Sequence, residues 1–143
     1  MHLTKSIPCT PYPPTITMVL CDSIDSARRE LGLKKSEKRN WDNGTIGMYY
    51  VDRGKSRNKF SLYLFVNVAK HTDVYDLLNT INHEANHLTN KILQYVDIVV
   101  DYDNDEAHTY LQAYIFEAVF KFFVENQDKL SIAKTKVIIQ TED

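Results

Sequence analysis

The amino-acid sequence predicts an α+β protein, because long helical patterns and short strand patterns occur in one chain. Two long segments, 73–95 and 106–126, carry apolar residues at three- and four-residue steps, the period of an α-helix. Two shorter segments, 45–52 and 59–67, show the two-residue alternation typical of strands. The 143 residues suffice for a buried core. We therefore expect a single domain over residues 1–143.

Composition narrows the possible partners. The chain is 43% hydrophobic and 25% charged, which is typical of a globular protein, and it has a net charge of −2. We therefore expect neither nucleic acid nor a membrane as a partner. The two cysteines, Cys9 and Cys21, lack the spacing of a redox pair and the density of a disulfide scaffold. Reduced thiols in a cytoplasmic protein are expected, with a Cys9–Cys21 bridge as the alternative.

The N-terminal third has three recognisable parts. Residues 1–14 contain all four prolines of the chain, which predicts an extended arm without regular structure. The β-branched, apolar segment 15–20 predicts a strand. Asp22 or Ser23 is then expected to cap a short helix that Gly32 ends.

The segments after residue 45 are predicted from their polar connections, helix caps and apolar patterns. The polar segment 53–58 joins the two alternating segments, so they are expected to pair as a hairpin. Thr72 or Asp73 is expected to cap the first long helix. The acidic stretch 101–106 leads into the second long helix, whose broad apolar arc predicts burial. Residues 127–143 give no firm prediction.

The middle of the first long helix carries an H-E-x-x-H motif, His83-Glu84-Ala85-Asn86-His87. Residues four apart lie on one face of a helix, so the two histidines can bind one metal ion. Glu84 lies beside that line, where a general base takes a proton from a metal-bound water. The apolar stripe of the helix centres away from both histidines, which therefore lie on the side of the helix that does not face the core. Two surface histidines without a metal are the alternative interpretation.

A catalytic zinc site needs a third protein ligand and keeps one position open. Glu106 is the strongest candidate, because it opens the helix that follows. It could instead complete a capping box with Asp103 as N-cap, and the helix dipole favours an acid there in any case. Asp103, Asp105 and His108 are the other candidate ligands.

The two motifs together carry a family resemblance. His83-Glu84-x-x-His87 followed by Asn104-Asp105-Glu106-Ala107 resembles the gluzincin branch of zinc metallopeptidases. The resemblance covers roughly residues 45–127. It implies zinc as cofactor, His83, His87 and Glu106 as its ligands, and Glu84 as catalytic base. It also implies a zincin-like fold, with a small, mostly antiparallel sheet whose edge strand lines a cleft beside the motif helix.

The expected function is peptide-bond hydrolysis on a peptide or protein substrate. Glu84 would take a proton from the zinc-bound water and return it to the leaving amine. An edge strand such as 59–67 could bind an extended peptide by strand addition. The donor that stabilises the transition state stays open among four residues that could equally be structural: Tyr110, Tyr114, His108 and His71.

A second function of a different class also agrees with the sequence. Compact zincins resembling this chain are expected in bacterial and phage genomes. The domain could therefore be a structural or binding protein, for example a component of a phage particle. Its zinc would then be structural or catalytically idle, and its location the virion.

Overall fold

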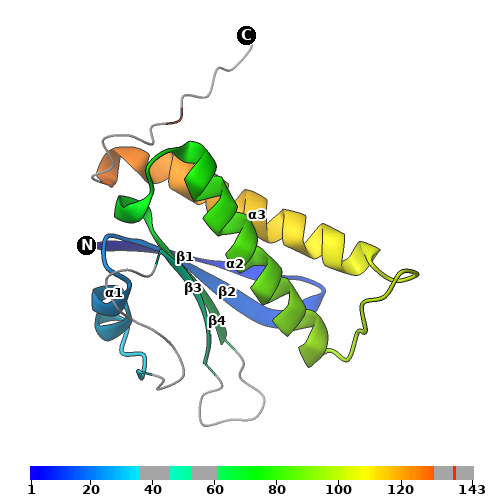
Figure 1. Cartoon of the computed structure of the whole chain (residues 1–143). Helices are drawn as coiled ribbons and strands as arrows, with labels where there is room; N and C mark the ends of the chain where they lie inside the picture. Colours follow the sequence, from blue (N-terminus) through cyan, green and yellow to red (C-terminus); the bar gives the residue numbers. More distant parts are fainter. Residues whose placement is uncertain (36–45, 53–60, 131–136, 138–143) are drawn as a thin grey trace.

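The computed structural model describes residues 1–35, 46–52, 61–130 and 137. These residues form an α+β protein, as predicted, with a four-stranded sheet and three α-helices (Figure 1). The elements in chain order are β1 (His2–Cys9), β2 (Tyr12–Cys21), α1 (Ile24–Glu30), β3 (Gly47–Asp52), β4 (Ser61–Asn67), α2 (Val74–Tyr95) and α3 (Glu106–Asn126). Two short 3-10 turns, Val68–Lys70 and Gln127–Lys129, follow β4 and α3.

The sheet has the strand order β1-β2-β4-β3. The pair β3–β4 is antiparallel, as the predicted hairpin requires. The pair β1–β2 is also antiparallel, whereas β2–β4 is parallel. The sheet is therefore mixed. The prediction that 59–67 provides the edge strand is wrong, because β4 pairs on both sides and β3 lies at the edge. Leu62, Leu64 and Phe65 are 0% exposed, and burial on both faces is what an interior strand requires.

The prediction of an irregular arm over residues 1–14 is also wrong. β1 and the start of β2 form an antiparallel hairpin at the other edge of the sheet. Its prolines are tolerated because of where they lie. Pro8 belongs to the edge strand, and Pro13 and Pro14 fall in a register irregularity before β2 begins its pairing with β4 at Thr15.

Helices cover both faces of the sheet. The long helices α2 and α3 pack together across one face, and α1 lies on the other (Figure 1). Alternation along β3 follows this division. Tyr49 and Val51 pack with the core under α2, whereas Met48 and Tyr50 pack with the core under α1. The edge strand thus presents one defined face to the motif helix.

Two helices begin and end at the predicted signals. Ser23 caps α1 by accepting a hydrogen bond from the Ser26 N–H, and Gly32 follows it with a φ of +71°. Asp73 caps α2 by accepting from the Asp76 N–H at 2.8 Å, and the helix ends at the predicted Tyr95. Most of residues 127–143 lie outside the described residues.

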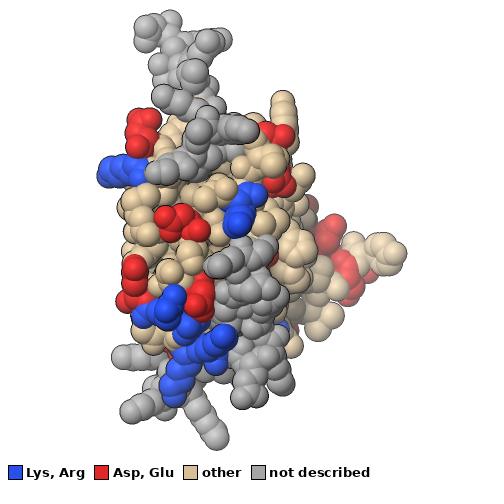
Figure 2. Space-filling model, turned by 60° about the vertical axis from the view of Figure 1, so that its left-hand side comes forward, with Lys and Arg blue, Asp and Glu red and all other residues tan. Residues whose placement is uncertain are grey.

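Charges of both signs lie interspersed on the face shown in Figure 2. On α1, for example, Asp25 bonds Arg28 at 3.0 Å and Arg29 at 3.4 Å. Among the described residues, no helix is long and apolar enough to cross a membrane.

Cys9 and Cys21 are free and buried. Their register partners, Tyr12 and His2, mark opposite ends of the β1–β2 hairpin. The two sulfurs are thus separated by nearly the length of β2, roughly 30 Å at 3.3 Å per residue, which excludes the alternative of a bridge. Burial raises the pKa of Cys9 to about 11 and that of Cys21 to about 12, so both thiols stay protonated.

Candidate metal centre

His83 and His87 form a converging pair on one face of α2. Their Nε2 atoms lie 3.1 Å apart, and their ring centroids 4.7 Å apart. Two imidazole nitrogens bound to one tetrahedral zinc lie about 3.3–3.4 Å apart, given zinc–nitrogen bonds of about 2.0–2.1 Å. His83 is exposed and His87 half-buried, so the pair is open to solvent. The pair therefore fits two adjacent positions of a metal with little movement.

Glu84 lies on the adjoining face of α2, beneath the edge strand. It is buried, with 6% of its surface exposed. Gly47, the first residue of β3, lies directly on it: a Cβ there would be 3.1 Å from Glu84 Cγ, 3.3 Å from Glu84 Oε1 and 2.5 Å from Thr80 Cγ2. No side chain larger than hydrogen fits without movement. The missing side chain of Gly47 lets the strand close over the carboxyl group and fix its position.

Tyr49 is a site residue that sequence reasoning missed. Its ring stacks on His87, with centroids 4.9 Å apart and planes at 28°. It lies two positions after Gly47, with one residue between them, so both lie on the same face of β3. The alternation in the sequence already placed them together, but only the position of β3 at the edge brings that face to the motif helix.

His71 links the end of β4 to α2. Its Nδ1 donates to the Asn67 carbonyl oxygen at 2.7 Å, and its Nε2 lies 2.7 Å from Thr80 Oγ1. Burial lowers the pKa of His71 below its ordinary value of 6.5. Both ring nitrogens are therefore used within the scaffold. This contradicts its candidacy as a transition-state donor and makes it a support for Thr80.

The other candidate donors are placed differently. Tyr114 donates its hydroxyl to the Pro8 carbonyl oxygen at 2.7 Å, which ties α3 to β1 and gives it a structural role. Tyr110 is 72% exposed and His108 is half-buried. Tyr49, in contrast, has a ring contact with a residue of the motif.

Glu106 is exposed and is the first residue of α3. The N-cap is Asp105, whose side chain makes no capping bond, so the alternative of a capping box with Asp103 as N-cap is wrong. Within the described residues, no three His, Cys, Asp or Glu side chains gather closely enough to hold a metal. The structure thus brings His83 and His87 together and leaves Glu106 and the three alternative ligands apart from them.

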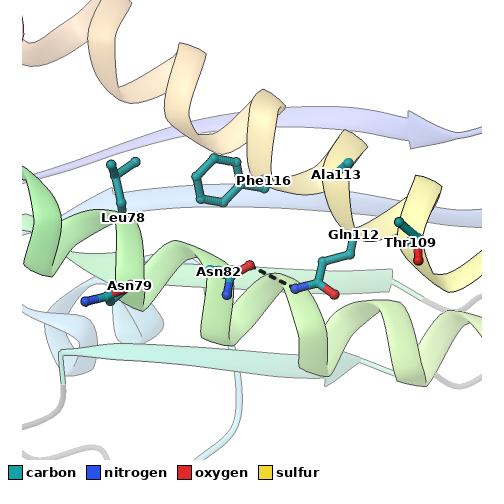
Figure 3. A pocket seen from close by; sticks show the side chains of 7 residues that line it. All are labelled: Leu78, Asn79, Asn82, Thr109, Gln112, Ala113 and Phe116. Carbon is teal, nitrogen blue, oxygen red and sulfur yellow. Dashed lines mark hydrogen bonds between the residues drawn. The ribbon is translucent and has the colours of Figure 1, made fainter.

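A side-chain hydrogen bond links α3 to the motif helix. Gln112 of α3 donates from Nε2 to Asn82 Oδ1 of α2 at 2.9 Å, and the two helices run antiparallel (Figure 3). The residues therefore fit a zinc centre in part, with two nitrogens in place and Glu106 apart from them.

No family model, curated protein or solved structure matches the chain. The function is therefore inferred from the geometry of the site.

Proposed function

We propose that the protein is a zinc-dependent hydrolase of the zincin type, most simply a metallopeptidase. His83, His87 and Glu106 would hold the zinc, and Glu84 would act as general base. The observation that carries the proposal is the pair of imidazole nitrogens 3.1 Å apart beside a carboxyl group buried under an edge strand. The two buried, unbridged cysteines of the protein support a cytoplasmic location.

Glu84 is the residue that moves protons in this mechanism. Zinc, when bound, polarises a substrate carbonyl and lowers the pKa of water to about 7. Glu84 accepts the proton that the attacking water loses and delivers it to the leaving amine. Gly47 lies directly on the Glu84 side chain and limits its rotamers, so the carboxyl group is oriented before substrate arrives.

The edge strand β3 is the natural place for an extended peptide. It is the last strand in the order of the sheet, and its Tyr49 stacks on His87. A peptide that adds as a further strand would gain main-chain hydrogen bonds and lie next to the histidine pair. This proposal moves the substrate strand from the expected 59–67 to Gly47–Asp52.

Replacing Glu84 with Gln tests the catalytic assignment. The substitution keeps size and should leave zinc content and folding intact, while hydrolysis of a diverse peptide library falls about 10²- to 10⁴-fold. The matched control is Glu117→Gln, the same chemical change at an exposed position of α3 that pairs with Lys121. Undiminished hydrolysis in Glu84→Gln, or a zinc-loaded wild type that cleaves nothing in the library, contradicts the proposal.

One observation favours a second candidate, a zincin-type domain that binds or assembles without catalysis. The histidine pair lacks a third ligand among the described residues. Zinc binding without any hydrolysis, together with a fourth zinc position filled by a protein side chain, would identify this function.

A further inference from the structure

A groove of about 460 Å³ lies between α2 and α3 (Figure 3). Its polar wall consists of Asn79 and Asn82 from α2 and Thr109 and Gln112 from α3. Its apolar part consists of Leu78, Ala113 and Phe116, and Leu78 points towards Phe116 across the space between the helices. Every lining residue is uncharged. The volume is within the range of sites that bind small molecules or substrate side chains.

The groove lies near the histidine pair along α2. Asn79, His83 and His87 are spaced by four residues, so they form one line along α2. Side chains at this spacing have Cβ atoms about 5–6 Å apart. The polar wall of the groove therefore begins one helical turn from the first metal ligand. A substrate group in the groove would lie next to any bond held at the histidine pair.

The polar wall offers a donor beside an acceptor. Gln112 donates from Nε2 to Asn82 Oδ1 (Figure 3), which leaves the Asn82 amide N–H groups and Gln112 Oε1 available to a ligand. The Asn79 side chain makes no hydrogen bond to the part of the chain that the structure describes. A primary carboxamide carries the complementary donor and acceptor. The methylene groups of such a side chain would contact the apolar part of the groove.

We propose that the groove is a substrate subsite that takes an uncharged, hydrogen-bonding side chain, glutamine or asparagine, of a peptide. The inference rests on the proposed peptidase function and names its specificity. A charged side chain would meet no counter-ion among the lining residues, so the groove offers it no matching partner. Glutamine has the longer apolar stem for contact with Leu78, Ala113 and Phe116, and its amide complements Asn82 and Gln112.

The cleavage profile of Asn82→Asp tests the subsite. The substitution keeps an acceptor for Gln112 and adds one negative charge to the groove. The wild type should cleave library peptides with Gln or Asn enriched at one position relative to the cut. The variant should favour Lys or Arg at that position by about tenfold and leave the other positions unchanged. Asn90→Asp is the matched control: it adds the same charge to an exposed site on α2 outside this groove. An Asn82→Asp profile equal to that of the wild type overturns the proposal.

A binding experiment separates this subsite from catalysis. The zinc-loaded Glu84→Gln protein is titrated with a neutral peptide containing one Gln, and the side-chain amide NMR signals of Asn79, Asn82 and Gln112 are followed. They should shift with this peptide and shift far less with the matched Glu peptide. If these signals shift but the wild type cleaves nothing, the peptidase proposal fails and the groove assignment stands. If the wild type cleaves peptides but these signals do not shift selectively, the groove assignment fails and the peptidase proposal stands. Shifts with a neutral oligosaccharide such as chitotriose, and not with the peptide, would overturn the peptide assignment.

Discussion

The two halves of the proposed metal centre differ in how firmly the fold holds them. On α2, the nitrogens of His83 and His87 lie 3.1 Å apart, and Glu84 is buried beside them. At the start of α3, Glu106 is exposed and its helix begins without a side-chain cap. Four-residue spacing on one helix is enough to bring two ligands together. A ligand from another helix depends on how the two helices pack.

The surroundings of the two halves explain the difference. The motif region of α2 is held by close contact with Gly47 of β3, by the His71–Thr80 bond and by the Asn82–Gln112 bond to α3. The segment 99–106 that leads into α3 is exposed throughout. We expect zinc to bind first to the histidine pair and then to draw in the acid, which is the way metal binding couples to folding.

The largest effect is expected from breaking the half on α2. Replacing His87 with Ala leaves one imidazole, so zinc should fall from about one equivalent per chain to below about a tenth. Metal analysis after purification without added zinc measures this. Asn90→Ala, on the same helix, should keep the full equivalent. If zinc in the wild type is well under half an equivalent and His87→Ala has the same content, the site is wrong.

Glu106 at the start of α3 should increase zinc affinity but should not be essential for zinc binding. Replacing Glu106 with Gln keeps its size and removes the charged ligand, so zinc affinity should fall roughly 100-fold, one ligand's share of a typical zinc binding energy. Stability without metal should change by less than about 1 kcal/mol, the usual contribution of an acid at a helix N-terminus. Competition with a chelator measures the affinity.

Three control variants accompany this measurement: Asp103→Asn, Asp105→Asn and His108→Ala. Each should retain zinc. Release of the metal by one of them, with Glu106→Gln unaffected, would identify that residue as the third ligand.

A moderate effect is expected where β3 meets α2. In Gly47→Ala the new methyl would collide with Thr80 Cγ2, so the free energy of unfolding should fall by about 1–3 kcal/mol. Thr80→Ser removes that methyl group and keeps the hydroxyl that bonds His71. The double variant should therefore lose less stability than the sum of the single losses, as measured by urea denaturation. Strict additivity would show that the strand does not close on Thr80 as described.

The smallest effect concerns pH. Because burial lowers the pKa of His71 below 6.5, the unfolded chain takes up a proton before the folded one as the pH falls. Stability that is present above pH 6.5 should decline below it, by at most about 1.4 kcal/mol per pH unit from this group. His71→Gln should make the unfolding free energy less dependent on pH between 6.5 and 5. An equal slope in both proteins would assign the decline to other groups.

The sequence by itself determined the features that depend on near neighbours. The cap at Asp73, the end of α2 at Tyr95 and the start of α3 at Glu106 all follow from local backbone chemistry and helical period. The placement of His83 and His87 on one face follows from the same period. The hairpin of β3 and β4 was predictable because alternating segments flank one polar connection.

Only the tertiary structure decided which distant segments pair. Proline content predicted an irregular N-terminus, but edge position and register let residues 2–9 form β1. The parallel pairing of β2 with β4 placed β3 at the edge, and with it Gly47 over Glu84 and Tyr49 against His87. Alternation states which side chains share a face of a strand, but not which strand lies beside it. The third ligand stays a prediction for the same reason: local sequence places an acid at the start of α3, and helix packing sets its distance from the histidines.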